Sequence, residues 1–196
     1  MRSFPRLLTD IRACEICAAS LPAGPRPVLQ AHPDARILIA GQAPGRRVHE
    51  SGVPFDDPSG VRLRKWLGLE RDAFYDPKLV AILPMGFCYP GTGKSGDLPP
   101  RKECAPAWRE ELLALLSNIE LTLVLGTYAQ AYHLDGGATT VTAAVKDWKS
   151  HWPDVLPLPH PSPRNQAWFK HNPWFAADVL PALRARVAEL GETPVK

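Results

Sequence analysis

The chain has 196 residues, of which 45% are hydrophobic, and a formal net charge of +3. This length and composition suffice to bury a sizeable core, and we expect one domain over residues 1–196. The charge is too small to identify a nucleic-acid partner by itself. The sequence has no run of about 18 apolar residues and no long apolar segment near its start, which argues against a membrane span and a signal peptide. We therefore expect a cytoplasmic protein without a membrane partner, and a monomer.

Short apolar runs and helix-like segments alternate along the chain. Four nearly continuous apolar runs are typical of strands buried on both faces of a sheet: 36–41, 79–85, 121–126 and 155–159. Segments with a helical pattern lie between and after them, at 59–69, 103–119, 128–134 and 172–190. This alternation predicts an α/β fold, a three-layer α/β/α sandwich around a central, mostly parallel four-stranded sheet. The loops at 41–57, 84–100 and 159–171 should carry the functional site, because they follow the carboxyl ends of strands.

The four cysteines fall into two groups. Cys14 and Cys17 form a C-x2-C pair, and fifteen residues separate Cys88 from Cys104 in a C-x15-C arrangement. Two closely spaced thiolates can face one metal centre, and a distant pair can complete the coordination. Zinc and an iron–sulfur cluster both suit four thiolates, whereas unrelated buried cysteines are the minor alternative and disulfides the least expected in a cytosolic chain.

The segment GQAPG directly follows the first predicted strand. Gly41, Pro44 and Gly45 allow the backbone to turn sharply and to approach a ligand closely, with main-chain N–H groups free to contact a carbonyl oxygen. The same glycines also suit an ordinary strand-to-helix turn. Gln42 cannot act as a base, but it can orient a water molecule by hydrogen bonds and is a candidate catalytic residue.

GQAPG, the cysteine arrangement and the segment HPSPRN after the last strand form an ordered set that resembles the uracil-DNA glycosylase superfamily. The resemblance extends from Cys14 to about Trp174. The cysteine layout is similar to the iron–sulfur branches called families 4 and 5, whereas HPSPRN is more similar to the single-strand-selective monofunctional uracil glycosylases. The resemblance implies a monofunctional, nucleoid-associated DNA glycosylase of base excision repair whose partner is DNA with a damaged base. It also favours a [4Fe-4S] cluster over zinc as the cofactor on the four cysteines.

The stretch GVPFDD supplies two residues that the resemblance assigns to the site. Phe55 lies where the family places a ring that stacks on the extruded base, although a core position is the plain alternative. Asp57 is the expected catalytic carboxylate, because FDDPSG resembles a family 5 stretch in which an aspartate follows the Phe by a few residues. One residue of that stretch is deleted in this chain. Asp56 is the alternate, and either could merely cap the following helix. Families 1 and 4 carry an acidic residue inside the first motif, where this chain has Gln42 and Ala43.

His160 opens HPSPRN at the end of the last strand. Departure of uracil leaves negative charge on the base, and a positioned imidazole can donate a hydrogen bond to the carbonyl oxygen where that charge gathers. His160 is therefore a candidate catalytic residue. The resemblance places Ser162 against a phosphate, and Pro163, Arg164 and Asn165 in a rigid wedge along the DNA groove.

The end of the second strand lacks the Asn with which families 1 and 4 read uracil. This chain has Pro84 there, with Met85 beside it. Proline offers neither a side-chain donor nor an N–H group, so base recognition would depend on backbone groups around Gly41 to Gly45 and Met85 to Gly86 and on the shape of the pocket. The alternative is that Asn165 or Gln42 supplies the missing amide. We therefore expect a relaxed glycosylase that removes uracil and also hypoxanthine or xanthine.

Two other functions remain open. The missing first-motif carboxylate is compatible with a catalytically silent protein that binds DNA or a damaged base. The glycine turn, together with a structural zinc, would also suit a phosphate-binding hydrolase of the α/β class.

Overall fold

A parallel sheet forms the centre of the fold. The computed structural model describes residues 2–94, 96–134 and 140–192. Its four-stranded sheet has the order β2-β1-β5-β6, with every neighbouring pair parallel. The strands are β1 (Ile37–Ala40), β2 (Val80–Ile82), β5 (Leu121–Leu125) and β6 (Val155–Leu158). All four lie inside the predicted apolar runs, and the predicted α/β fold class is confirmed.

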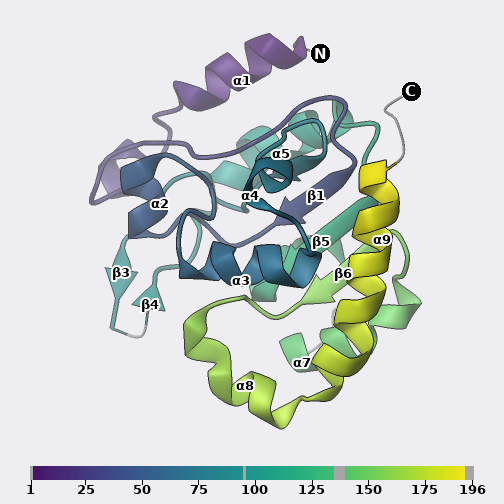
Figure 1. Ribbon diagram of the computed structural model, residues 1–196. Helices are drawn as coiled ribbons and strands as arrows, with labels where there is room; N and C mark the ends of the chain where they lie inside the picture. Colours follow the sequence, from purple (N-terminus) through teal and green to yellow (C-terminus); the bar gives the residue numbers. More distant parts are fainter. Residues whose placement is uncertain (1, 95, 135–139, 193–196) are drawn as a thin grey trace.

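Helices surround the sheet (Figure 1). They are α1 (Phe4–Arg12), α2 (Arg46–Ser51), α3 (Pro58–Leu67), α4 (Arg71–Phe74), α5 (Cys104–Ala114), α6 (Gly126–His133), α7 (Val141–Lys146), α8 (Gln166–His171) and α9 (Leu180–Glu192). The predicted helices correspond to α3, α5, α6 and α9, the last preceded by a π-helical turn at Phe175–Val179. Within the described residues, no helix is both long and apolar enough to cross a membrane.

The three segments expected to be loops contain short elements. Helix α2 lies within 41–57, α8 lies within 159–171, and the hairpin of β3 (Thr92–Gly93) and β4 (Gly96–Asp97) lies within 84–100, of which residue 95 is outside the described residues. Helices α1, α4 and α7 were not expected either. Elements of two to six residues are too short to show a periodic apolar pattern, which is why the sequence did not reveal most of them.

Alternate side chains of the strands face opposite layers. Ile37 and Ile39 pack in a core cluster with residues of α3 and α9. Leu38 packs in a second cluster with α1 and α5, and Ala40 packs in a third with α6. Since both faces are covered, the strands read as continuous apolar runs. Pro157 is tolerated in β6 because β6 is an edge strand, where a missing N–H removes no hydrogen bond between strands.

Candidate active site

A cavity of about 240 Å³ lies beyond the carboxyl ends of β1, β2 and β6. Parallel strands bring these ends to one edge of the sheet, so the segments that follow them meet there. The cavity wall contains these residues named by the sequence analysis: Gly41, Gln42, Pro44, Gly45, Phe55, Asp57, His160, Ser162 and Arg164. Met85, Pro163 and Asn165 do not line it.

Met85 belongs to the core. Its side chain is only 7% exposed and packs in the cluster that contains Ala40 and Val124. Its backbone N–H donates to the Gly41 carbonyl (2.8 Å), so it is not free for a ligand. Pro84, one residue earlier, lines the cavity in its place. The expectation that Met85 binds the base is therefore not supported by its position.

Gln42 joins the first motif to the β3–β4 hairpin. Its side-chain Nε2 donates a hydrogen bond to the carbonyl of Leu98 (3.0 Å). The amide oxygen is the part of this side chain that remains to accept a hydrogen bond from water, as expected for a residue that orients water and cannot remove a proton.

Phe55 contacts the core and also lines the cavity. Its ring lies edge-on to Phe74, with centroids 6.4 Å apart, and a Cβ atom at Gly41 would lie 3.7 Å from its Cζ atom. The backbone of Phe55 has a φ angle of 55°, in the left-handed region that non-glycine residues seldom adopt. Gly60 permits this conformation, because a Cβ atom there would lie 1.7 Å from the Phe55 carbonyl oxygen. Such a strained position at a cavity wall is typical of a functional site.

Asp57 is the N-cap of α3 and a wall residue of the cavity. Its Oδ1 accepts a hydrogen bond from the backbone N–H of Gly60 (2.8 Å). Asp56 instead pairs with Arg71 (3.2 Å) and is absent from the cavity wall. Of the two alternatives, the structure therefore places Asp57 with the other site residues, and the cap leaves one of its carboxylate oxygens for the cavity.

The imidazole of His160 has a defined hydrogen-bonding state. Its Nδ1 accepts a hydrogen bond from the backbone N–H of Ser162 (3.2 Å), so the neutral ring carries its proton on Nε2. Burial lowers the pKa of His160, while the carboxylates of Asp57 and Asp97 oppose this shift. The lowered pKa keeps the ring neutral near pH 7, with one N–H available as a donor.

Side-chain hydrogen bonds to its backbone hold the HPSPRN loop in place. Asn165 donates from its side-chain amide to the His160 carbonyl (2.8 Å), and the hydroxyl of Ser162 accepts from the backbone N–H of Arg164 (3.2 Å). Arg62 of α3 donates to the Ser162 carbonyl (3.0 Å). Asn165 therefore supports the loop from outside the cavity, Arg164 lines the cavity, and Pro163 is exposed to solvent.

Two polar wall residues were missed by the sequence analysis. Ser59 is a buried residue of the first turn of α3, and Asp97 is the last residue of β4. The only signal for Asp97 was its location in the 84–100 segment, which was expected to carry part of the site.

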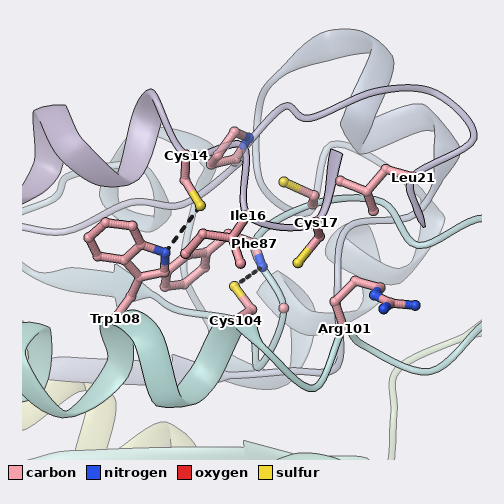
Figure 2. A pocket seen from close by; sticks show the side chains of 11 residues that line it. Cys14, Ile16, Cys17, Leu21, Phe87, Arg101, Cys104 and Trp108 are labelled. Atoms are coloured by element: carbon pink, nitrogen blue, oxygen red, sulfur yellow. Dashed lines mark hydrogen bonds between the residues drawn. The ribbon is translucent and has the colours of Figure 1, made fainter. Parts of the chain in front are cut away.

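The four cysteines line a second cavity, together with Arg101 and Trp108 (Figure 2). Cys14 and Cys17 follow α1, Cys88 follows β2, and Cys104 begins α5. All four are free thiols. Figure 2 shows the labelled thiols turned toward a common space. The sequence prediction that distant cysteines meet in one place therefore agrees with the structure.

The surroundings of the thiols include N–H donors. Trp108 Nε1 donates to the Cys14 sulfur (3.3 Å), and the backbone N–H of Phe87 donates to the Cys104 sulfur (3.3 Å). Burial raises the pKa of Cys104 to about 12, and charge on the other cysteines adds to the shift. A bound cation would reverse this effect and stabilise thiolates. Among the described residues, however, no three or more His, Cys, Asp or Glu side chains form a ready-made site for a single metal ion.

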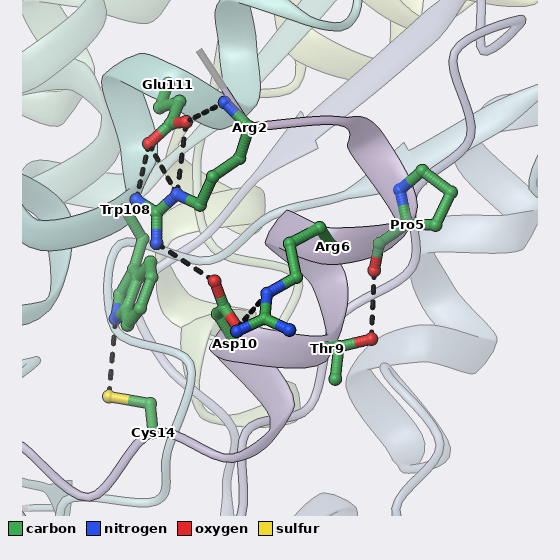
Figure 3. A network of polar contacts seen from close by, with 8 residues as sticks. All are labelled: Arg2, Pro5, Arg6, Thr9, Asp10, Cys14, Trp108 and Glu111. Carbon is green, nitrogen blue, oxygen red and sulfur yellow. Dashed lines mark hydrogen bonds and ion pairs between the residues drawn. The ribbon is translucent and has the colours of Figure 1, made fainter.

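An ionic network holds the N-terminal segment against α5 (Figure 3). The guanidinium of Arg2 bonds to the Glu111 carboxylate through Nε (3.1 and 3.2 Å) and to Asp10 through Nη1 (3.3 Å). It also lies over the Trp108 ring, 5.1 Å from the ring centroid. The hydrogen bonds from Arg2 lower the pKa of Glu111 to about 2. Helix α1 is thereby docked on α5, which positions Cys14 next to Trp108.

A comparison with protein families identifies the superfamily of the chain. Residues 29–184 match the family described as the Uracil DNA glycosylase superfamily. The matched region contains every residue that lines the 240 Å³ cavity except Val28, and it contains Cys88 and Cys104. It begins after Cys14 and Cys17. The match covers well over half of the chain and confirms the predicted relationship at the superfamily level. The chain therefore belongs to the uracil DNA glycosylase superfamily.

Proposed function

We propose that this chain is a monofunctional DNA glycosylase that hydrolyses the N-glycosidic bond of a flipped, deaminated base. Uracil is the proposed main substrate, with hypoxanthine or xanthine as a further one. The observation that carries this proposal is the meeting of Phe55, Asp57 and the His160 imidazole in one cavity at the edge of the sheet. A base must leave the DNA stack to reach such a cavity, since its glycosidic bond is inaccessible inside a duplex.

Each of these side chains has a distinct part in the proposed reaction. The Phe55 ring stacks on the flipped base, which stabilises binding by roughly 1–3 kcal/mol. The Nε2–H of His160 donates to the base carbonyl, where negative charge accumulates as the bond to the sugar breaks. Asp57 orients a water molecule toward C1′ and accepts its proton, while the base leaves as an anion. A neutral imidazole suffices for this role, because the developing anion strengthens the hydrogen bond.

The HPSPRN loop is the proposed contact with the DNA backbone. Arg164 lies at the cavity wall and carries a positive charge suited to a phosphate next to the flipped nucleotide. The bonds from Arg62 and Asn165 to the loop backbone keep His160 and Arg164 in a fixed relation. Such preorganisation favours catalysis, since no ordering is needed once the base has entered.

We also propose that Cys14, Cys17, Cys88 and Cys104 hold a [4Fe-4S] cluster. The four thiols line one cavity, and the resemblance of their spacing to the iron–sulfur branches favours a cluster over zinc. The N–H donors near the sulfurs of Cys14 and Cys104 are of the kind that stabilise thiolate ligands. The cluster would link three parts of the chain: the N-terminal segment, the segment that follows β2, and helix α5. Hydrolysis of a glycosidic bond needs no electron transfer. The proposed role of the cluster is therefore structural.

The test of the activity uses oligonucleotides that carry one uracil, hypoxanthine or xanthine, each as single strand and as duplex. Enzyme in excess is incubated with each substrate, and alkali then reveals abasic sites. The variant Asp57→Asn/His160→Ala is the matched negative control. Cleavage of uracil DNA by the parent and not by this variant supports the proposal. Tight binding without cleavage would instead support the second candidate, a silent binding protein, which Ala43 in the first motif favours.

The test of the cofactor is anaerobic purification followed by metal and sulfide analysis. A brown protein with a broad shoulder near ~400 nm and with iron and sulfide in equal amounts supports the cluster. A colourless protein that contains zinc would refute it while leaving the proposed glycosylase activity untouched.

A further inference from the structure

The β3–β4 hairpin contributes a carboxylate to the base cavity from a segment outside the recognised motifs. Asp97, the last residue of β4, lines the cavity with Gly45 and His160. Figure 1 shows this hairpin standing apart from the central sheet, near α2. The Oδ2 atom of Asp97 lies 3.3 Å from the position that a Cβ atom at Gly45 would occupy. The lack of a side chain at Gly45 is therefore what leaves room for the Asp97 carboxylate at the wall.

Asp97 is oriented by the hairpin. The hydroxyl of Thr92 donates to its Oδ1 (3.2 Å), and Thr92 in turn shares a hydrogen bond with the Tyr89 hydroxyl (2.5 Å). The bond from Gln42 to the Leu98 carbonyl ties the next residue of the hairpin to the first motif. Because Oδ1 already accepts from Thr92, Oδ2 is the oxygen that faces Gly45 and remains for a ligand.

The chemistry of the wall indicates which ligand group this oxygen would meet. A carboxylate accepts hydrogen bonds and repels a DNA phosphate, so its partner must be a donor such as an N–H of the base. Among the described residues, the charge of Asp97 acts on Arg46 and on His160, and neither forms a salt bridge with it. Pro84 at the end of β2 has no polar side chain, and Oδ1 of Asp57 is used by the helix cap. His160 supplies a donor for a base carbonyl, and Asp97 supplies the complementary acceptor.

Building on the proposed function, we propose that Asp97 is a specificity-determining residue that reads the ring N–H of the flipped base. Its Oδ2 accepts a hydrogen bond from N3–H of uracil or from N1–H of hypoxanthine. Cytosine and adenine carry a lone pair on the same ring nitrogen, which an anionic acceptor repels. Deamination converts this lone pair into an N–H in a pyrimidine and in a purine alike. One carboxylate can therefore distinguish uracil from cytosine and hypoxanthine from adenine. Thymine and guanine carry the same N–H, so this contact does not exclude them.

The test compares DNA containing uracil with DNA containing 3-methyluracil, in which a methyl group replaces the N3 hydrogen. Single-turnover rates are measured for the parent and for Asp97→Ala. Loss of one charge-assisted hydrogen bond should slow uracil removal by about 10- to 100-fold in this variant. The rate of 3-methyluracil removal should change much less. Asp97→Ala should therefore prefer uracil over 3-methyluracil less strongly than the parent does. If the parent does not cleave 3-methyluracil from DNA, free uracil and free 3-methyluracil are compared as inhibitors of uracil removal, for the parent and for Asp97→Ala.

Two further variants complete the experiment. Asp97→Asn keeps an acceptor oxygen without the charge and should retain part of the preference for uracil. Asp178→Asn changes an exposed aspartate of the π-helical turn and should behave like the parent.

The outcomes separate the two proposals. An Asp97→Ala variant that cleaves uracil at the parental rate refutes the assignment. Equal losses on uracil and 3-methyluracil also refute it, because they would indicate that Asp97 only supports the hairpin. A parent that cleaves no substrate would refute the proposed function itself.

Discussion

Replacing His160 by alanine tests the chemistry of the base cavity most directly. Nδ1 is engaged by the Ser162 N–H, so the ring has a single N–H, on Nε2, to offer to the base. The variant therefore loses one oriented donor and no charge, since burial lowers the pKa of His160 and keeps the ring neutral. Loss of one such donor commonly costs roughly 10²–10³-fold in rate, about 3–4 kcal/mol.

The assay is single-turnover cleavage of uracil DNA with enzyme in excess, and DNA affinity is measured separately. We expect the loss in the cleavage rate and little change in affinity, because the donor acts mainly on the charge of the departing base. His160→Gln supplies an amide N–H and should recover part of the rate, while His151→Ala serves as the control outside the cavity. A His160→Ala variant that cleaves like the parent, or one that loses only affinity, would refute the role of His160.

Four further predictions concern the carboxylate Asp57, the cysteine cavity, the choice of base and His133. Asp57→Asn should slow single-turnover cleavage more than Asp56→Asn, and the reverse order would identify Asp56 as the carboxylate. Cys104→Ala should lower soluble yield and iron content more than it alters the choice of base; full yield with all iron retained would contradict a structural cluster. The parent should release uracil and at least one of hypoxanthine and xanthine, and cleavage of uracil alone would show that selectivity is not relaxed. Burial lowers the pKa of His133 to about 4. Since the unfolded side chain takes up a proton near pH ~6.5, the free energy of unfolding should fall as the pH is lowered from about 6.5 to 4. Urea denaturation should show this dependence in the parent and a weaker one in His133→Gln.

Helix α5 connects the two cavities. It begins at Cys104, and its buried Arg109 donates to the carbonyls of Leu83 (2.9 Å) and Pro84 (3.2 Å) at the end of β2. Arg109 also donates to His133 (2.7 Å). A guanidinium can satisfy several carbonyl acceptors at once, which explains a buried arginine at this position. Helix α5 therefore carries both a residue of the cysteine cavity and a residue that holds the end of β2 in place.

Most of the sheet and much of the site could be predicted from local sequence. A strand buried on both faces requires a continuous apolar run, and such runs located β1, β2, β5 and β6. The residues directly after these strands could be grouped in advance, because the carboxyl ends of parallel strands meet at one edge. This reasoning placed Gly41 and His160 in the same cavity.

Tertiary packing decided the remaining features. Pro84 and Met85 are neighbours in the segment after β2, yet Met85 packs in the core and Pro84 lines the cavity. Asp97 enters the site through a hairpin whose strands have two residues each, too short to leave a pattern in the sequence. Apolar periodicity reports which face of an element is buried, whereas the meeting of Asp97 with Gly45 depends on contacts between segments that are distant in the chain. The sequence by itself determined the family, the sheet and the ends of its strands, and the three-dimensional packing selected which of the neighbouring side chains line the cavity.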